Sequence, residues 1–320
     1  MRLFPAILAL TCTTSAALAA PPAIVTDLPV TGSLVAMVMG DLGAPHVLLP
    51  QGADAHDYQL RPSDAAALQA AGLLIWVGPE MTPWLNRAAG QITRGNSLAL
   101  LQVQGTHRQD FAAGGQDHPH DDHSHDHDHD HSHAHDHGHD HSHDHSGTDP
   151  HAWLDPHNAQ LWLAAIRDAL TAADPENAAA YAANAQAAAA RIEELDARIT
   201  AQLAPVAGKP FVVMHDAYGY FTGHYGLTPA IPVSLGDAAA PSAAQIAAIR
   251  EQIGAQNIAC IFPEPISNPR LIAAITEGTA IRTGAPLDPE GTAQNQGADL
   301  YPAMLAGLAD ALAGCLESTP

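Results

Sequence analysis

Residues 174–205 read DPENAAAYAANAQAAAARIEELDARITAQLAP, and this stretch decides how the rest of the chain is organised. Asp174 begins a strong helix start, because an acidic N-cap followed by proline and a second acid suits the positive end of a helix dipole. From there to Leu203 the segment is rich in helix formers and has no glycine or internal proline. We expect a helix of about 29 residues, roughly 43 Å long, that ends at Pro205.

Short apolar runs alternate with helical segments on both sides of this helix. Before it, the pattern predicts strands at 23–26, 47–50 and 73–77 and helices at 63–71 and 83–92. After it, the pattern predicts strands at 211–214, 231–234 and 258–262 and helices at 218–225, 242–253, 268–277 and 300–316.

This alternation favours an α/β fold of two lobes, each a mainly parallel sheet flanked by helices. We expect an N-terminal lobe at 21–173, one long rigid backbone helix at 174–204 and a C-terminal lobe at 205–320. A lone surface helix within one domain would need far less length. The 320 residues and 33.3 kDa leave room for two such lobes.

Composition excludes some classes of partner. Apolar residues make up 47% of the chain and charged residues 14%, which is typical of a globular protein. Twelve Lys and Arg against 34 Asp and Glu give a net charge of −22, which repels phosphate backbones and anionic lipid headgroups. We therefore expect no nucleic-acid partner.

Residues 1–20 have the pattern of a secretory signal peptide. Arg2 precedes an apolar run at 3–10, and Ala17-Leu18-Ala19 is a small-residue cleavage pattern. No other apolar stretch approaches the roughly 18 to 20 residues that cross a bilayer. We expect the mature protein to be exported and soluble, with Cys12 removed along with the signal.

Two cysteines then remain, Cys260 and Cys315. An even pair in an oxidising compartment suggests one disulfide between a strand and the C-terminal helix, worth roughly 4 kcal/mol in the loop-entropy model. Two separate buried thiols are the alternative.

A histidine-rich segment at 117–145 interrupts the N-terminal lobe. It alternates histidine with Asp, Ser, Gly or Ala, so it cannot pack a core, and it predicts a low-specificity ligand for zinc, copper or nickel. An inert solvated linker is the alternative. Its fourteen histidines are His118, His120, His123, His125, His127, His129, His131, His133, His135, His137, His139, His141, His143 and His145.

Three other histidines lie where a ligand would be useful. His56 follows a predicted strand, His151 opens a helix, and His215 follows the strand at 211–214. Because ligands bind at the carboxyl ends of strands in open α/β sheets, all three could meet in a cleft between the lobes. Taken singly, each of them is more often a structural or surface histidine.

Five motifs carry a resemblance to a known family. They resemble the ZnuA-type periplasmic zinc-binding proteins, in the cluster of solute-binding proteins that serve zinc and manganese ABC importers. The resemblance runs from about residue 23 to 317, and a His-rich insert before the second histidine is typical of the zinc members. The motifs are GADAHDYQLRPSD at 52–64, WVGPEM at 76–81, DPHAWLDP at 149–156, HDAYGYF at 215–221 and LDPEGT at 287–292.

The resemblance implies one metal ion in the cleft between two α/β lobes. His56, His151 and His215 match the family's three ligand histidines, and Asp288 matches a carboxylate that is a ligand in some members. Manganese members have a carboxylate in place of His215, and three imidazoles suit zinc better. Some zinc members have a glutamate where this chain has Ala55, so the fourth ligand is Asp288 or a water.

The resemblance also bears on neighbouring residues. Tyr58, Asp155 and Asp216 are the candidates for holding the imidazole N–H groups. Cys260 and Cys315 match a cysteine pair of the family, which favours the disulfide. For His46, His107, His157 and His224 we expect a surface position without a role.

The expected function is capture of periplasmic Zn²⁺ with high affinity and delivery to an inner-membrane zinc ABC permease, with the His-rich segment as antenna or reservoir. We expect a monomer, and a periplasmic metallochaperone is a further candidate partner. A metal-storage protein and a manganese-binding protein are the alternatives. Three histidines and a water also occur in hydrolytic zinc enzymes, but no His-Glu-x-x-His, Gly-x-Ser-x-Gly or phosphate-binding loop is present, so we expect no enzyme.

Overall fold

The structure of the protein is a computed structural model that describes residues 21–56, 58–92, 96–111, 147–234 and 241–317. The predicted signal peptide and the His-rich segment lie outside the described residues. None of the helices in the described part is long and apolar enough to cross a membrane.

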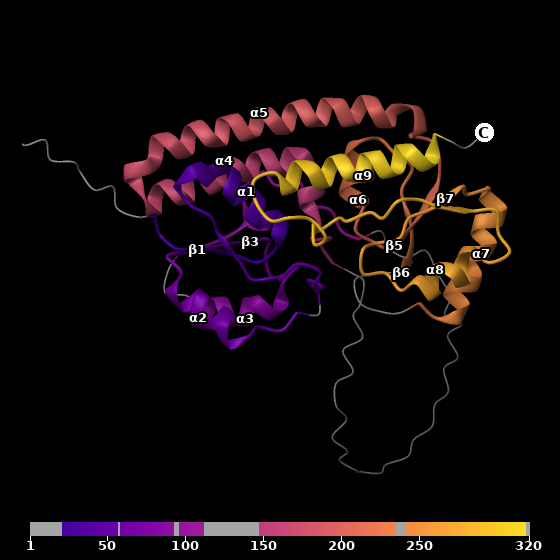
Figure 1. Cartoon of the computed structure of the whole chain (residues 1–320), viewed down its shortest axis with the longest axis horizontal. Coiled ribbons are helices and arrows are strands. Elements are labelled where there is room, and N and C mark those ends of the chain that lie inside the picture. The colour runs from indigo at the N-terminus through magenta and orange to yellow at the C-terminus, as the bar shows by residue number, and fades with distance from the viewer. Residues whose placement is uncertain (1–20, 57, 93–95, 112–146, 235–240, 318–320) are drawn as a thin grey trace, which may run out of the picture.

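Two parallel four-stranded sheets form the frame of the molecule (Figure 1). The first has the order β2-β1-β3-β4, and the second has the order β6-β5-β7-β8. The strands of the first sheet are β1 Ile24–Thr26, β2 His46–Val47, β3 Leu73–Trp76 and β4 Asn96–Ala99. Those of the second are β5 Phe211–His215, β6 Ile231–Ser234, β7 Cys260–Ile261 and β8 Arg282–Thr283.

Helices cover these sheets, and the prediction of two parallel α/β lobes is confirmed. In Figure 1, α2 and α3 lie on one side of the first sheet, α1 and α4 lie on the other, and α7 and α8 flank the second sheet. The helices are α1 Pro29–Met39, α2 Pro62–Ala70, α3 Pro83–Ile92, α4 Pro156–Ala173, α5 Ala178–Leu203, α6 Gly219–His224, α7 Ala243–Gln256, α8 Pro269–Thr276 and α9 Leu300–Leu316.

The long helix α5 runs past both sheets, with α9 beside it (Figure 1). It has 26 residues, or about 39 Å, and is shorter at its start than the sequence predicts. The carboxylate of Asp174 does not cap α5, because it accepts hydrogen bonds from Asn177 Nδ2 at 2.7 Å and the Tyr181 hydroxyl at 2.8 Å. Residues Pro175–Asn177 form a 3₁₀ turn before the helix, and Ala204–Val206 form another after it.

One apolar core is shared by both sheets. The inward face of α5 buries residues at helical spacing, and these pack with α1, α4 and α9. The same cluster contains Leu73 of the first sheet and Phe211 of the second. The buried residues of α5 are Tyr181, Ala185, Ala188, Ile192, Leu195, Ile199 and Leu203.

The predicted disulfide is present. Cys260 in β7 and Cys315 in α9 are joined by an S–S bond of 2.04 Å. It fastens the second sheet to the closing helix of the chain.

Candidate metal centre

The three predicted histidines converge at the carboxyl ends of the sheets. His56 follows β2, His151 precedes the 3₁₀ helix η3 (Ala152–Leu154), and His215 is the last residue of β5. Their ring centroids lie 5.4 Å apart for His151 and His215, 5.8 Å for His56 and His151, and 6.3 Å for His56 and His215. Together with Glu290, each offers one ligand atom, and these atoms all lie within 4.8 Å of one another.

A cleft of about 520 Å³ opens onto this group. Its walls include His56 from the N-terminal half and His215, Glu264 and Glu290 from the C-terminal half. His151, whose ring lies 5.4 Å from that of His215, is fully buried. The cleft therefore gives a small solute a path to the histidines from one side.

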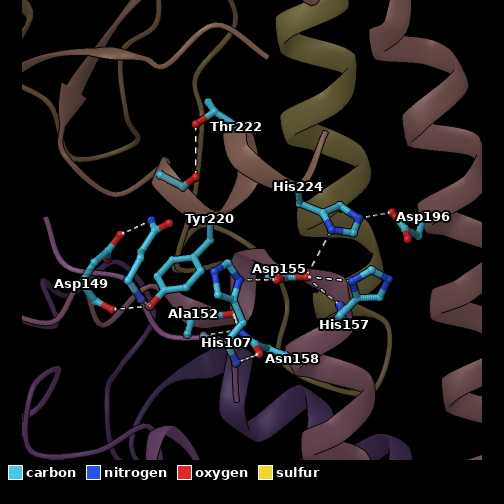
Figure 2. A network of polar contacts seen from close by, with 12 residues as sticks. His107, Asp149, Ala152, Asp155, His157, Asn158, Asp196, Tyr220, Thr222 and His224 are labelled. Carbon is cyan, nitrogen blue, oxygen red and sulfur yellow. Dashed lines mark hydrogen bonds and ion pairs between the residues drawn. The ribbon is translucent and has the colours of Figure 1, made fainter. Parts of the chain in front are cut away.

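The ring of His151 is fixed by a buried carboxylate. Its Nδ1 lies 2.8 Å from Asp149 Oδ1, while its Nε2 is buried and makes no hydrogen bond to the residues that the structure describes. Asp149 is held in turn by Gln109 Nε2 at 3.1 Å. The carbonyl of Asp149 accepts the Tyr220 hydroxyl at 2.9 Å, as Figure 2 shows. A proton on Nδ1 leaves the lone pair on Nε2, which is the form that binds a metal.

The ring of His215 is fixed in the same way by Glu264. Nδ1 of His215 lies 2.8 and 2.9 Å from the two carboxylate oxygens of Glu264, and the Tyr218 hydroxyl donates to Oε1 at 2.9 Å. Burial and the nearby Glu264 raise the pKa of Tyr218 well above its ordinary value, so this hydroxyl keeps its proton. Glu264 lies three residues after the end of β7, so the segment after β7 supports a histidine of the neighbouring strand β5.

Glu290 supplies the carboxylate that faces the histidines. Its Oε1 lies 3.4 Å from His56 Nε2, and both side chains are 11% exposed. Burial alone would raise the pKa of Glu290, but the contact with His56 and the nearness of His215 and His151 outweigh it and lower that pKa. An ionised carboxylate beside three imidazoles is a ligand set suited to zinc.

Asp288, the expected carboxylate ligand, has a different place. Its oxygens accept the backbone N–H groups of Thr292 and Ala293, each at 3.0 Å, and it lies outside the group of four. Trp153 Nε1 also donates to the carbonyl of Pro289 at 2.7 Å. These contacts shape the loop so that Glu290 reaches the histidines.

The residues proposed to hold the imidazoles have other partners. The Tyr58 hydroxyl donates to Asp64 at 2.7 Å. Asp155 caps α4 by accepting the His157 N–H at 2.9 Å, and its second oxygen lies 2.9 Å from His107 Nδ1. Asp216 lines a separate pocket with Gln109 and others, so its role stays a prediction.

Sequence reasoning missed Asp149, Glu264 and Glu290. Each had a signal: Asp149 lies two residues before His151, Glu264 follows the end of a strand, and Glu290 belongs to the same motif as Asp288. The surface position expected for His224 is also wrong. Its side chain is only 11% exposed and lies between Asp155 and Asp196, because α6 packs this residue against α4 and α5.

The chain matches known proteins over nearly its whole length. It matches the ZnuA family, zinc-uptake complex component A periplasmic, over residues 24–315. It is 58% identical over 299 residues to the high-affinity zinc uptake system protein ZnuA of Paracoccus denitrificans (strain Pd 1222), covering 92% of each chain. It is 39% identical over 300 residues to the protein of the same name from Brucella suis biovar 1 (strain 1330), covering 89% of each.

Solved structures show the same fold. A crystal structure of ZnuA has a TM-score of 0.73 at 22% identity, covering 92% of this chain and 99% of that one. The periplasmic zinc binding protein TroA from Treponema pallidum has a TM-score of 0.72 at 18% identity, with the same coverage of 92% and 99%. By its sequence match and its fold, the chain belongs to the ZnuA family of periplasmic zinc-uptake components.

Proposed function

We propose that this protein captures Zn²⁺ in the periplasm and delivers it to an inner-membrane ABC permease. The observation that carries the proposal is the convergence of His56, His151, His215 and Glu290 at the base of a cleft. The relatives from Paracoccus and Brucella are named as high-affinity zinc uptake proteins, which agrees with this cargo. We expect the protein to act as a monomer, and a metallochaperone is a further candidate partner.

The ligand set favours zinc over manganese. Three imidazoles and one carboxylate match the nitrogen-rich, four-coordinate sites of zinc, whereas manganese prefers a majority of oxygen ligands. The carboxylates of Asp149 and Glu264 hold two of the rings in position before the ion arrives. We propose Glu290 as the fourth ligand, in place of Asp288 or water.

We expect binding without catalysis. The two glutamates nearest the histidines are engaged, Glu264 by His215 and Tyr218 and Glu290 by His56. A hydrolytic zinc site needs instead a base beside an open position on the metal. Zinc-loaded protein should therefore hydrolyse a p-nitrophenyl ester no faster than a variant in which His56, His151 and His215 are all replaced by alanine.

The His-rich segment at 117–145 is proposed as an antenna that raises the local zinc concentration near the cleft. Storage by this segment alone is the competing function, because its composition would bind zinc without the cleft site. The two functions differ in which residues the tight site needs.

A competition titration against a zinc chelator separates them. The wild type should hold one tight ion plus weaker ones, and removal of residues 117–145 should keep the tight ion and lose the weak ions that this segment binds. The triple variant His56→Ala, His151→Ala and His215→Ala should lose the tight ion and keep the weak ones. His46→Ala, which removes an exposed histidine, is the control. Tight binding that survives in the triple variant would contradict the proposal. So would tight binding that is lost when the His-rich segment is removed.

Transport is tested in cells. In a strain that lacks its own zinc-binding protein but keeps the permease, the wild type and the His46→Ala variant should restore growth in zinc-limited medium. The triple variant should not. Restoration of growth by the triple variant would favour storage of zinc by the His-rich segment.

A further inference from the structure

A second group of metal-ligating side chains lies outside the candidate metal centre. Asp155, His157 and His224 each offer one ligand atom, and these atoms lie within 4.8 Å of one another. Asp155 caps the start of α4, His157 is in its first turn, and His224 is the last residue of α6. Figure 2 shows the three side chains meeting from these two helices.

The geometry brings two imidazole nitrogens to one carboxylate oxygen. Asp155 Oδ1 lies 3.3 Å from His224 Nδ1 and 3.7 Å from His157 Nδ1. The two rings lie 4.7 Å apart, nearly at right angles. An ion between these atoms would replace direct contacts that are longer than a good hydrogen bond.

Two neighbouring side chains, Asp196 and His107, orient His224 and Asp155. His224 Nε2 lies 2.7 Å from Asp196 Oδ1 on α5, so a proton on Nε2 leaves the lone pair on Nδ1 toward Asp155. This carboxylate–histidine relay is the usual support of a metal-binding imidazole. The other oxygen of Asp155 is held by His107 Nδ1 at 2.9 Å.

Charge and access also suit a cation. The carboxylates of Asp155 and Asp196 lie on either side of the His224 imidazole, 3.3 Å from its Nδ1 and 2.7 Å from its Nε2. The side chain of His157 is 71% exposed while that of Asp155 is 7% exposed, so an ion can enter from solvent and reach a buried oxygen.

We propose that Asp155, His157 and His224 form a second site for a borderline divalent cation such as Zn²⁺, on the outer face of the junction between α4, α5 and α6. The site shares no ligand with the candidate metal centre. Two imidazoles and one carboxylate leave a position for water, so it binds more weakly than the four-residue group. Because α4 precedes the long helix in the chain and α6 follows it, a bound ion ties both halves of the molecule together.

Anomalous diffraction from crystals of the full chain, soaked in millimolar zinc near neutral pH, tests the site directly. We expect one peak among His56, His151, His215 and Glu290 and a second peak among Asp155, His157 and His224. His157→Ala should remove the second peak and leave the first. His46→Ala, which removes another exposed histidine, should keep both. His224→Gln provides a second variant that lacks one ligand.

Absence of the second peak in the wild type would overturn the proposal, and so would a second peak that His157→Ala leaves unchanged. In the first case the group is a hydrogen-bonded network in which a proton on His224 takes the place of the ion. In solution, added zinc should raise the midpoint of thermal unfolding less in His157→Ala than in His46→Ala. Equal rises would contradict a tie between the two halves.

Discussion

The carboxylate of Asp149 holds His151 twice, since Oδ1 accepts the backbone N–H of His151 at 3.0 Å and lies 2.8 Å from its Nδ1. Both residues are buried. The carboxylate therefore fixes the tautomer and the direction of the ring before a metal ion arrives. Such outer partners typically contribute a factor of about 10 to 100 in metal affinity.

We predict that Asp149→Ala lowers the zinc affinity of the tight site by about 10- to 100-fold. Asp149→Asn should lose less, because its amide oxygen can still accept from Nδ1. The measurement is chelator competition in protein that lacks residues 117–145. Asp168→Ala, which removes an exposed carboxylate of α4, is the control, and equal affinities in the Asp149 and Asp168 variants would contradict the prediction.

Glu290→Gln tests the fourth ligand. The change removes the charge beside His56 while keeping the size of the side chain, so we expect at least about tenfold weaker zinc binding, or 1.4 kcal/mol. Zinc-edge absorption spectroscopy should show altered coordination in this variant. Asp288→Asn should change affinity less, because Asp288 bonds to the backbone of its own loop. A larger loss in Asp288→Asn would return the ligand role to Asp288.

The disulfide should stabilise the fold without affecting the metal centre. Cys260 and Cys315 are 55 residues apart in sequence, and closing a loop of that size is worth about 4 kcal/mol in the loop-entropy model. Replacing both by serine should lower the free energy of unfolding in urea by up to this amount. Zinc affinity of the folded variant should stay within a few-fold of wild type. An unchanged unfolding midpoint would show that the crosslink contributes nothing.

Asp27 should make stability fall as the pH rises from about 4 to about 6. Burial at the end of β1 raises the pKa of Asp27 from 3.8 to about 6, although the N–H groups of Leu28 and Val77 bond to it. Because the folded pKa is the higher one, the protonated form favours the folded state. Its stabilising effect is complete below pH 4 and is lost through pH 6.

The size of this loss is about 3 kcal/mol, at 1.36 kcal/mol per pKa unit. The measurement is the free energy of unfolding of the wild type minus that of Asp27→Asn, followed across this pH range. The difference should shrink in the direction of higher pH. A difference that stays flat or grows with pH would contradict the raised pKa.

Many of the elements could be predicted from the sequence because their patterns are local. The bounds of α3, β6 and α9 agree with the predicted ranges. Helix α1 was missed because almost all its residues are buried, so it shows no polar face. Strands β4 and β8 were missed because they are short strands at sheet edges with exposed residues.

The candidate site was predicted in part. The three histidines lie in motifs that a sequence reveals, and two of them, His56 and His215, also follow predicted strands. Their supporting carboxylates could not be identified in this way, because which of 34 acidic residues reaches an imidazole depends on tertiary packing. Whether Asp288 or Glu290 faces the histidines depends on the conformation of the loop that holds both. In this loop Gly291 has a φ of 71°, a left-handed conformation that favours glycine.

The apolar core shared along α5 limits how the protein can release its zinc ion. A wide opening of the two halves needs an interface that few contacts cross, whereas one apolar cluster of the described residues includes residues of both sheets and of α5. The two halves should therefore melt in a single step. Release of the ion then requires movement of short segments at the cleft, such as the loop that carries Glu290. A permease that takes up the ion has to displace that loop.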